Sequence, residues 1–562
     1  MKLELQLIGL GLTIYVFLVF QFLYFQKKNR IELEQTLKKE WGNFSTKEWH
    51  PSDWERLTHS FTVFSHTIFI DTITWNDFEM DAIFRQINQT HSSIGEEYLY
   101  YLLHTPATEK EKLEEREHLI TYFTTHEKER IAFQVLAEKI GKQKKESLYE
   151  SLFGFKEIPV LKSWKHILSD IFLIGSFLFL LVNPILGIFL LILALAYSIS
   201  LYYKEKAKVA NSISCFQQII PLLKAIDKRM IFQTTELKPY FDQMADAQKK
   251  LISFKKFSLL FGRGFSGSPI DILLDYVRML THIDLILFNQ VVVQFQMYKN
   301  EILFCMNQFG FLESMIAAAS YRKALPNYCI PEFLTLDGQK NPLSIKLTNV
   351  YHPRIETPVK NSIAVKKSVL LTGSNASGKS TFLKTTAIAA LLAQTIHTVP
   401  ADQYQAPFYQ IYSSMAIRDN LSGHDSYYMV EIKSLKRILD AKKDTIPVLC
   451  FIDEVLRGTN TVERIAASTE ILKSLSNQQV LCFAATHDIE LTQLLKEEYE
   501  NYYFREQIQK EDILFDYQLK KGISTSRNAI RLIQQIGYEK KIVDRALLRA
   551  DTFLKTGSWR EI

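Results

Sequence analysis

Residues 368–385 read SVLLTGSNASGKSTFLKT, and this stretch decides the fold of the C-terminal part of the chain. The run from Gly373 to Ser380 fits the pattern G-x-x-x-x-G-K-[ST]. A β-rich run precedes the pattern and a helix-forming run follows it, which is the context that a phosphate-binding loop requires. The stretch therefore predicts a strand, a loop that curls around phosphate oxygens, and a helix whose N-terminus faces them.

Each position of this loop has a predicted role in binding a nucleoside triphosphate. Gly373 and Gly378 let the backbone turn so that its amides point at phosphate oxygens. Lys379 is predicted to reach the β- and γ-phosphates, and Ser380 or its neighbour Thr381 to hold Mg²⁺. The predicted cofactors are therefore ATP and Mg²⁺. The other loop residues predicted to contact the nucleotide are Ser374, Asn375, Ala376 and Ser377.

Two further apolar runs are predicted strands that end in polar residues. VLCFID (448–453) ends at Asp453, which is followed by Glu454. In a nucleotide-binding protein this pair is a Walker B candidate, in which Asp453 contacts Mg²⁺ and Glu454 polarises the attacking water. VLCFAAT (480–486) is followed by His487, which we expect to sense the γ-phosphate from the carboxyl edge of the sheet. A plain strand end and a core or surface histidine are the competing interpretations.

Outward from these motifs, the pattern of apolar and polar residues divides the chain into two classes of structure. After about Pro342, short β-rich runs alternate with helical segments, which is typical of an α/β domain with a mostly parallel sheet. Residues 30–160 and 204–330 are predicted to be mainly helical. The predicted fold class is thus an α/β P-loop ATPase domain at the C-terminus, preceded by an all-α region that apolar segments interrupt. The loop FGRGFSGSP (261–269) is either a surface turn or a second phosphate cradle.

The composition restricts the possible functions only mildly. The 562 residues carry a net charge of +6, which is compatible with nucleic-acid binding without proving it. A hydrophobic share of 47% permits a packed core and excludes global disorder. The five cysteines form no C-x-x-C pair, which argues against a disulfide scaffold or a zinc ribbon and suits a reducing cytosol.

The first apolar stretch, residues 7–25, holds 19 residues without a charge. This is about the length needed to cross the ~30 Å hydrocarbon core of a bilayer. Lys27, Lys28 and Arg30 follow at once. A cleavable signal peptide is the alternative, but the run is long for one and no small-x-small cleavage site follows it. We predict an uncleaved anchor.

The second apolar stretch, residues 171–203, holds 33 residues without a charge and is too long for one crossing. Asn183-Pro184 in its middle favours a turn, so we predict a hairpin of helices at 165–182 and 185–203. A buried hairpin of a soluble protein is the alternative. Lysines flank both ends of the hairpin, which places these flanks in the cytoplasm. The predicted protein is a multi-pass protein of the cell (inner, cytoplasmic) membrane with three transmembrane helices in the lipid bilayer.

Four blocks of this sequence resemble, in order and spacing, those of the MutS mismatch-repair ATPases. A generic ATPase with a phosphate loop would lack the second and the third. The blocks are TGSNASGKSTFLKT (372–385), AIRDNLSGHDSYYMVEI (416–432), IDEVLRGTNT (452–461) and ATHDIELTQLL (485–495). The resemblance implies an ATP hydrolase that forms a homodimer with composite ATP sites, in which Ser426 approaches the nucleotide of the partner subunit. It also implies DNA as a ligand and Tyr517 on one face of the adenine, while Val359 stands where the family stacks an aromatic ring.

The chain also departs from the family. The family's core pattern begins near residue 80, which leaves no room for the mismatch-reading and connector domains. The clamp insertion is missing from residues 204–340 as well. We therefore expect a membrane-anchored short form of the MutS family, whose mismatch recognition is in doubt.

The expected domains follow the chain in linear order. They are a transmembrane anchor (1–26), a cytoplasmic helical region that begins the MutS-like core (27–164), a transmembrane hairpin (165–203), a helical core or lever (204–340), and a MutS-type ATPase domain with C-terminal dimerisation helices (341–562). The expected function is ATP-dependent DNA binding linked to mismatch repair or to surveillance of DNA structure. The alternative is a nucleotide-gated membrane module that acts on a partner other than DNA; a transporter ATPase is a weaker third interpretation.

Overall fold

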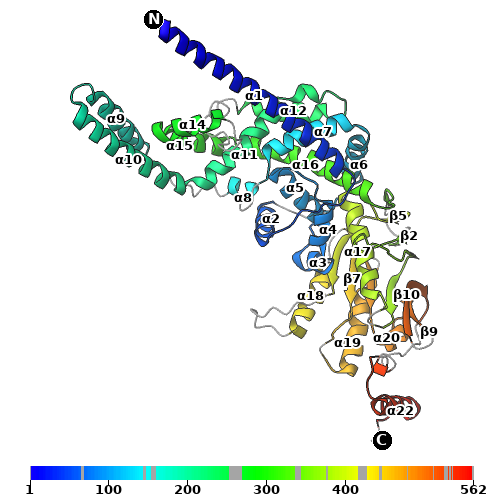
Figure 1. Ribbon diagram of the computed structural model, residues 1–562. Helices are drawn as coiled ribbons and strands as arrows, with labels where there is room; N and C mark the ends of the chain where they lie inside the picture. Colours follow the sequence, from blue (N-terminus) through cyan, green and yellow to red (C-terminus); the bar gives the residue numbers. More distant parts are fainter. Residues whose placement is uncertain are drawn as a thin grey trace. The chain divides into compact units, whose positions relative to one another are not determined.

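The chain forms two compact units in the computed structural model (Figure 1), and each is described by itself. The helical unit consists of Met1–Ser65, Gln86–Leu102 and His118–Ala324, and the sheet unit of His66–Arg85, Leu103–Glu117 and Leu325–Ile562. The structure describes residues 2–64, 69–142, 147–153, 160–251, 269–335, 343–374, 377–415, 427–441, 446–457, 459–477, 479–509, 512–523, 530, 533–534 and 536–559. The two units interleave along the chain, whereas the sequence predicts domains in linear order.

Helices make up the helical unit, as predicted for residues 30–160 and 204–330. Three helices include residues of both units: α4 (Met80–Ile87), α5 (Ser93–His104) and α6 (Lys110–Thr125). The elements that lie wholly in the helical unit are α1 (Lys2–Glu40), α2 (Pro51–Val63), α7 (Glu127–Ile140), α8 (Leu148–Phe153), α9 (Ser163–Phe179), α10 (Pro184–Lys208), α11 (Ala210–Ile226), η2 (Arg229–Ile231), α12 (Lys238–Lys249), α14 (Pro269–Thr281), α15 (Ile283–Met297) and α16 (Lys299–Ala324). The loop at 261–269 falls almost entirely outside the described residues.

A buried carboxylate joins α5 to α16 in the core of the helical unit. Glu313 of α16 accepts hydrogen bonds from the backbone N–H groups of His91 (2.5 Å) and Ser92 (3.0 Å) and from the Ser92 hydroxyl. Burial raises the pKa of Glu313, and these donors oppose that rise. Gly95 lies directly against the carboxylate, and a Cβ at this position would overlap it. Only glycine therefore fits here.

We expect Gly95→Ala to destabilise the helical unit by about 1–3 kcal/mol, the usual cost of an overpacked core. Urea unfolding in detergent, followed by circular dichroism, measures the change. Gly175→Ala is the matched control, because a Cβ at this helical glycine meets no atom within 4 Å. Equal stability of the two variants would contradict the close approach of α5 and α16.

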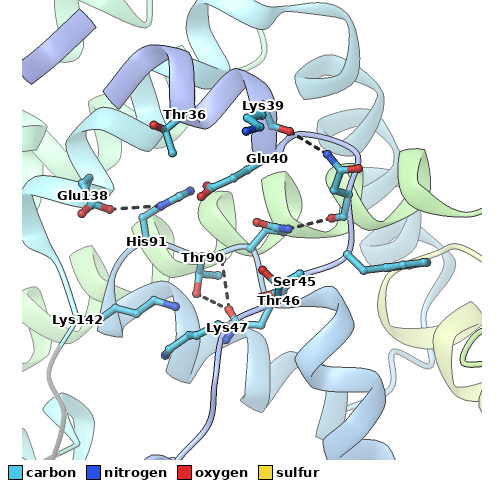
Figure 2. Close-up of a pocket in the computed structure, with 14 residues that line it drawn as sticks. Thr36, Lys39, Glu40, Ser45, Thr46, Lys47, Thr90, His91, Glu138 and Lys142 are labelled. Carbon is cyan, nitrogen blue, oxygen red and sulfur yellow. Dashed lines mark hydrogen bonds and ion pairs between the residues drawn. The ribbon is translucent and has the colours of Figure 1, made fainter. Parts of the chain in front are cut away.

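Glu96, also on α5, is the centre of a buried charge network. Its carboxylate pairs with the Arg56 guanidinium and lies 2.6 Å from the Lys142 ammonium and 3.3 Å from that of Lys47. Burial opposes its charge, but Lys142, Arg56 and Lys47 hold the pKa of Glu96 well below its usual range. Both lysines also line a cavity of about 720 Å³ (Figure 2). The network thus ties the segment after α1 to the segment after α7.

The hairpin predicted at 165–203 is present as α9 and α10. Asn183 caps α10, because its side-chain oxygen accepts the backbone N–H of Leu186 at 3.1 Å, and Pro184 occupies the first turn. Most large apolar side chains of the hairpin are exposed in the structure. Those more than half exposed include Leu168, Ile171, Ile174, Phe177, Leu181, Val182, Ile185, Phe189 and Ile192.

The prediction of three transmembrane helices is not supported. In the described part of the chain, two helices are long and apolar enough to cross a membrane, α10 and α16, or up to three if the bent pair α14–α15 forms one span. The apolar window of α16 is 72% buried inside the structure, so this helix belongs to the core. Helix α9 has only 17 residues. Most side chains of residues 7–25 lie outside the described set, so the first span stays a prediction.

The sheet unit carries the strands that the motifs predict: SIKLTNV, SVLLTG, VLCFID and VLCFAAT become β2, β4, β7 and β8. Its elements are α3 (Thr72–Asp77), β1 (Glu332–Phe333), β2 (Ile345–Val350), β3 (Asn361–Val365), β4 (Ser368–Thr372), α17 (Lys379–Thr395), β5 (Gln403–Ala406), β6 (Gln410–Ser414), α18 (Tyr427–Ala441), β7 (Val448–Asp453), α19 (Thr461–Ser474), β8 (Val480–Ala485), α20 (Glu490–Leu494), β9 (Tyr499–Gln509), β10 (Asp512–Lys521) and α22 (Lys540–Thr556).

Two sheets organise this unit. The larger has six strands in the order β10-β9-β4-β8-β7-β6, in which neighbours from β9 to β6 are parallel and β10 is antiparallel to β9. The smaller has four strands in the order β1-β5-β2-β3. The central strands β4 and β8 are buried along their whole length, which explains why they read as unbroken apolar runs.

A segment far upstream completes the sheet unit. The Asp77 carboxylate, at the end of α3, accepts hydrogen bonds from the Ser413 hydroxyl (2.7 Å) and the Met415 backbone N–H (2.9 Å). Ser413 lies on β6 at the edge of the larger sheet. Residues 66–85 therefore belong with the ATPase-like strands, although the sequence groups them with the helical region.

Candidate functional site

Three motifs meet at one edge of the larger sheet. Strands β4, β8 and β7 are neighbours and parallel, so their carboxyl ends lie at the same edge, where ligands bind in open α/β sheets. The loop 373–378 follows β4, His487 follows β8 by one residue, and Glu454 follows β7 directly. The topology therefore gathers residues that are more than a hundred positions apart in sequence.

The loop needs glycine at both positions that the motif specifies. Gly373 has φ +139° and Gly378 has φ +103°, a region that side chains disfavour. A Cβ at 373 would lie 2.9 Å from both the Phe504 carbonyl oxygen and the Ser377 hydroxyl. A Cβ at 378 would lie 3.2 Å from the Tyr517 ring. The backbone can therefore curl tightly only because neither residue has a side chain.

Lys379 is the first residue of α17, and its side chain turns back into the loop. The residue is 2% exposed, and its Nζ donates to the carbonyl oxygens of Gly373 (2.6 Å) and Ser374 (2.8 Å). The Ser374 hydroxyl is buried and has no hydrogen-bond partner among the described residues. A buried cation, an unused hydroxyl and a helix N-terminus at one loop fit the oxygens of a polyphosphate.

Ser380 and Asp453 offer the oxygen ligands that Mg²⁺ prefers. Ser380 is half-buried in the first turn of α17, while the neighbouring Thr381 side chain is exposed, which favours Ser380. Across the described residues, no group of three or more His, Cys, Asp or Glu could hold a metal ion. In nucleotide sites Mg²⁺ is usually held by one or two protein oxygens together with phosphate oxygens, and Ser380 and Asp453 suit that arrangement. Asn375, Ala376 and residues 416–426, which include Ser426, lie outside the described residues.

Glu454 is held between the side chains of His487 and Arg457. Its Oε1 lies 2.9 Å from His487 Nε2, and its Oε2 lies 2.9 Å from Arg457 Nε. The hydrogen bond from His487 lowers the pKa of Glu454 against the effect of burial, with help from the charges of Arg457 and Lys379. The carboxylate is thus ionised at neutral pH, as a general base requires. Its φ of +62° is a strained conformation for glutamate, of the kind found at functional sites.

Two residues that lie in the MutS-like blocks, but to which the sequence assigns no role, have a positioning role. Arg457 donates from Nη2 to the Asp453 carbonyl oxygen at 2.7 Å, in addition to its pairing with Glu454. Glu431 of α18 is 3% exposed, and its carboxylate accepts the backbone N–H groups of Leu456 (2.6 Å) and Arg457 (3.1 Å). Burial raises the pKa of Glu431 while these bonds oppose the rise. Glu431 therefore holds the turn after β7 in shape from within the same chain.

We expect Glu431→Ala to lower kcat about tenfold and to leave nucleotide affinity nearly unchanged, because two backbone donors of the turn lose their acceptor. Steady-state ATPase assays and nucleotide titration separate the two effects. Lys436→Ala, an exposed change on the same helix, is the control. A loss of affinity with a normal kcat would show that Glu431 acts on binding instead.

The two residues expected near the adenine come together around one asparagine. The Asn361 side-chain amide donates to the backbone carbonyls of Tyr517 (3.0 Å) and Val359 (3.4 Å). Tyr517 lies on an irregular part of β10 with φ +51°, and its ring stands beside Gly378. Both side chains are substantially exposed, so Tyr517 and Val359 are available to a base next to the phosphate loop.

Comparison with known proteins finds relatives for the part of the chain that holds this site. Residues 369–553 match the family model described as MutS domain V. The DNA mismatch repair protein MutS of Thermus thermophilus is 33% identical over 197 residues, which cover 34% of this chain and 24% of that protein. Its counterpart in Pseudothermotoga lettingae is 31% identical over 243 residues (41% and 29%), and that of a Thermotoga species 28% over 270 residues (46% and 33%).

The matched region contains the loop at 373–380, Asp453, Glu454 and His487. The chain spans only about a quarter to a third of the length of these curated relatives. The similarity thus supports a relationship to the MutS family, whose members are ATPases, through the C-terminal P-loop fold.

Proposed function

We propose that this protein is a membrane-anchored MutS-type ATPase that binds and hydrolyses ATP with Mg²⁺ and couples this cycle to DNA. The observation that carries the proposal is the cluster at the sheet edge, where Lys379 lies in the glycine loop and Glu454 is held between His487 and Arg457. This cluster falls within the region that matches MutS domain V.

Each side chain has a defined task in this proposal. The loop amides and Lys379 hold the β- and γ-phosphates, while Ser380 and Asp453 hold Mg²⁺, which neutralises charge on the phosphate oxygens. Glu454 accepts a proton from the attacking water, and His487 keeps its carboxylate ionised and oriented. Tyr517 borders the base.

A homodimer with composite sites and DNA as the ligand are the parts of the proposal that rest on the relatives. These proteins are named for DNA mismatch repair, and they support DNA binding here. Ser426 would then approach the nucleotide of the partner subunit. Because the matched region excludes most of the relatives' length, mismatch recognition is not part of the proposal.

Membrane anchoring rests on the hairpin. Within the charge-free stretch 171–203, helices α9 and α10 turn large apolar side chains outward, whereas soluble proteins rarely expose large apolar patches. Lysines at the base of the hairpin favour a cytoplasmic location for both units and the inner membrane as the site of the protein.

The decisive experiment is the ATPase rate of the detergent-solubilised protein with homoduplex, mismatched and branched DNA at two salt concentrations. We expect stimulation by DNA that weakens steeply at the higher salt, because phosphate contacts release counterions. The ranking of the three DNAs would identify the preferred structure.

A second candidate function is a nucleotide-gated membrane module that acts on a protein or lipid. The exposed hairpin favours it, since anchoring restricts the protein to partners at the membrane. A normal basal ATPase rate that is indifferent to all three DNAs would support this candidate and exclude the first.

A further inference from the structure

Helices α14 and α15 bury polar as well as apolar side chains, and they expose several large apolar ones. They meet at His282, which has φ +47°, and the chain bends there by 86°. Between Leu274 and Met297 the only charged side chains are Asp275, Arg278 and Asp284. Arg278 and Asp284 are buried at 7% and 2% exposure. The exposed large apolar side chains are Tyr276, Val277, Ile283, Val293 and Met297, and the uncharged Gln290 and Gln296 are exposed beside them.

Two polar side chains of the pair, His282 and Asp284, face the hairpin. His282 lies 3.1 Å from His166 on α9 and 3.0 Å from the Ser198 hydroxyl on α10. The Tyr202 hydroxyl, also on α10, donates to the Asp284 carboxylate at 2.9 Å. These contacts place α14 and α15 beside α9 and α10 within the helical unit, as Figure 1 also shows.

Further hydrogen bonds join α15 to the start of the hairpin. The Asn289 side chain accepts the Leu161 backbone N–H at 3.0 Å and donates to the Leu161 carbonyl at 2.7 Å. The Ser163 hydroxyl donates to the Ile286 carbonyl oxygen at 3.1 Å. All these partners lie in or next to the half of the hairpin nearest its lysine-flanked base. Helices α14 and α15 therefore lie beside that half of the hairpin.

We infer that α14 and α15 form a re-entrant helix pair embedded in the bilayer leaflet nearest the hairpin's base, with the hydrocarbon core as the partner of its apolar face. The inference rests on the proposed membrane anchoring and extends it. Burial of Arg278 and Asp284 together with outward-facing large apolar side chains suits a lipid environment, where an exposed charge is costly.

The connections of the pair and the absence of charge on the exposed face of α15 support the same inference. Helix α12 precedes the pair, α16 follows it, and these two helices pack on each other. The chain must therefore enter and leave the bilayer on the same side. Helix α15 packs against α9, and its exposed side chains, which are Ile283, Val293, Met297 and two glutamines, carry no charge.

Photolabelling from within the bilayer tests this inference on the full chain. The protein is reconstituted in vesicles of phosphatidylcholine and phosphatidylglycerol in equal parts, and a carbene-generating apolar reagent is activated in the hydrocarbon core. Mass spectrometry then compares peptides from α15, from the hairpin and from α16. Helix α16 is the internal control, because it is as long and apolar as a span but buried in protein.

We expect label on the hairpin and on α15 at several times the level on α16. Label on the hairpin without label on α15 would overturn the inference and leave the anchoring proposal intact. Label on neither would remove the anchoring proposal itself. Equal label on α15 and α16 would also overturn the inference, because labelling would then follow hydropathy instead of exposure.

A charge on the outward face provides the second measurement. We expect Val293→Lys to reduce labelling of α15 severalfold while labelling of the hairpin is unchanged. Met230→Lys is the matched control, since Met230 is an exposed apolar residue of the helical unit outside the pair, at 76% exposure. Unchanged labelling of α15 in Val293→Lys would contradict a lipid-facing position for this residue.

Discussion

Lys379→Ala is expected to abolish ATP binding at micromolar nucleotide. The ammonium group lies inside the glycine loop, where its Nζ is 2.6 Å from the Gly373 carbonyl oxygen. In the ATP complex this cation would bond phosphate oxygens, and each charge-assisted bond contributes about 1.5–3 kcal/mol. Loss of two such bonds corresponds to an affinity at least a hundredfold lower. Isothermal titration with ATP and Mg²⁺ measures the effect.

Two controls distinguish a loss of ATP binding from a loss of folding. Lys473→Ala removes an exposed lysine of α19 in the same unit and should bind ATP normally. A thermal unfolding curve for both variants checks that the sheet unit is intact. If Lys379→Ala keeps its affinity for ATP while folded, the loop at 373–380 is not the phosphate site.

Glu454→Gln is expected to reduce turnover by about 10²–10⁴-fold, the usual contribution of a general base. Binding of ATP should persist, so the variant should accumulate as an ATP-bound closed dimer. The substitution is nearly isosteric: the amide oxygen can accept from Arg457, and the amide nitrogen can donate to His487 if the imidazole carries its proton on Nδ1. The geometry of the turn should therefore survive.

Two measurements identify the cause of this effect. Single-turnover hydrolysis reports the chemical step, and size-exclusion chromatography with light scattering reports the ATP-dependent dimer. Glu470→Gln, an exposed change on α19, is the control and should leave both unchanged. Normal turnover in Glu454→Gln would exclude Glu454 from the activation of water.

Local patterns in the sequence are sufficient to predict the strands, loop and helix that form the candidate site. The loop motif, the apolar runs before Asp453 and His487, and the turn at Asn183 each depend on neighbours within a few residues. The structure places these elements as strand, loop and helix in the predicted order. The reason is physical: glycine at positive φ, apolar strands buried on both faces and an asparagine cap are properties of short segments.

Contacts between distant segments were decided only by the tertiary structure. Glu431 supports the turn at Leu456, and Asp77 joins β6, because folding brings together groups that no spacing rule connects. Length and hydropathy admit both α10 and α16 as spans, although the charges of α16 already set it apart from the charge-free stretch of α10. One is exposed and the other is packed among helices, and burial is a relation between segments that a single stretch of sequence does not contain.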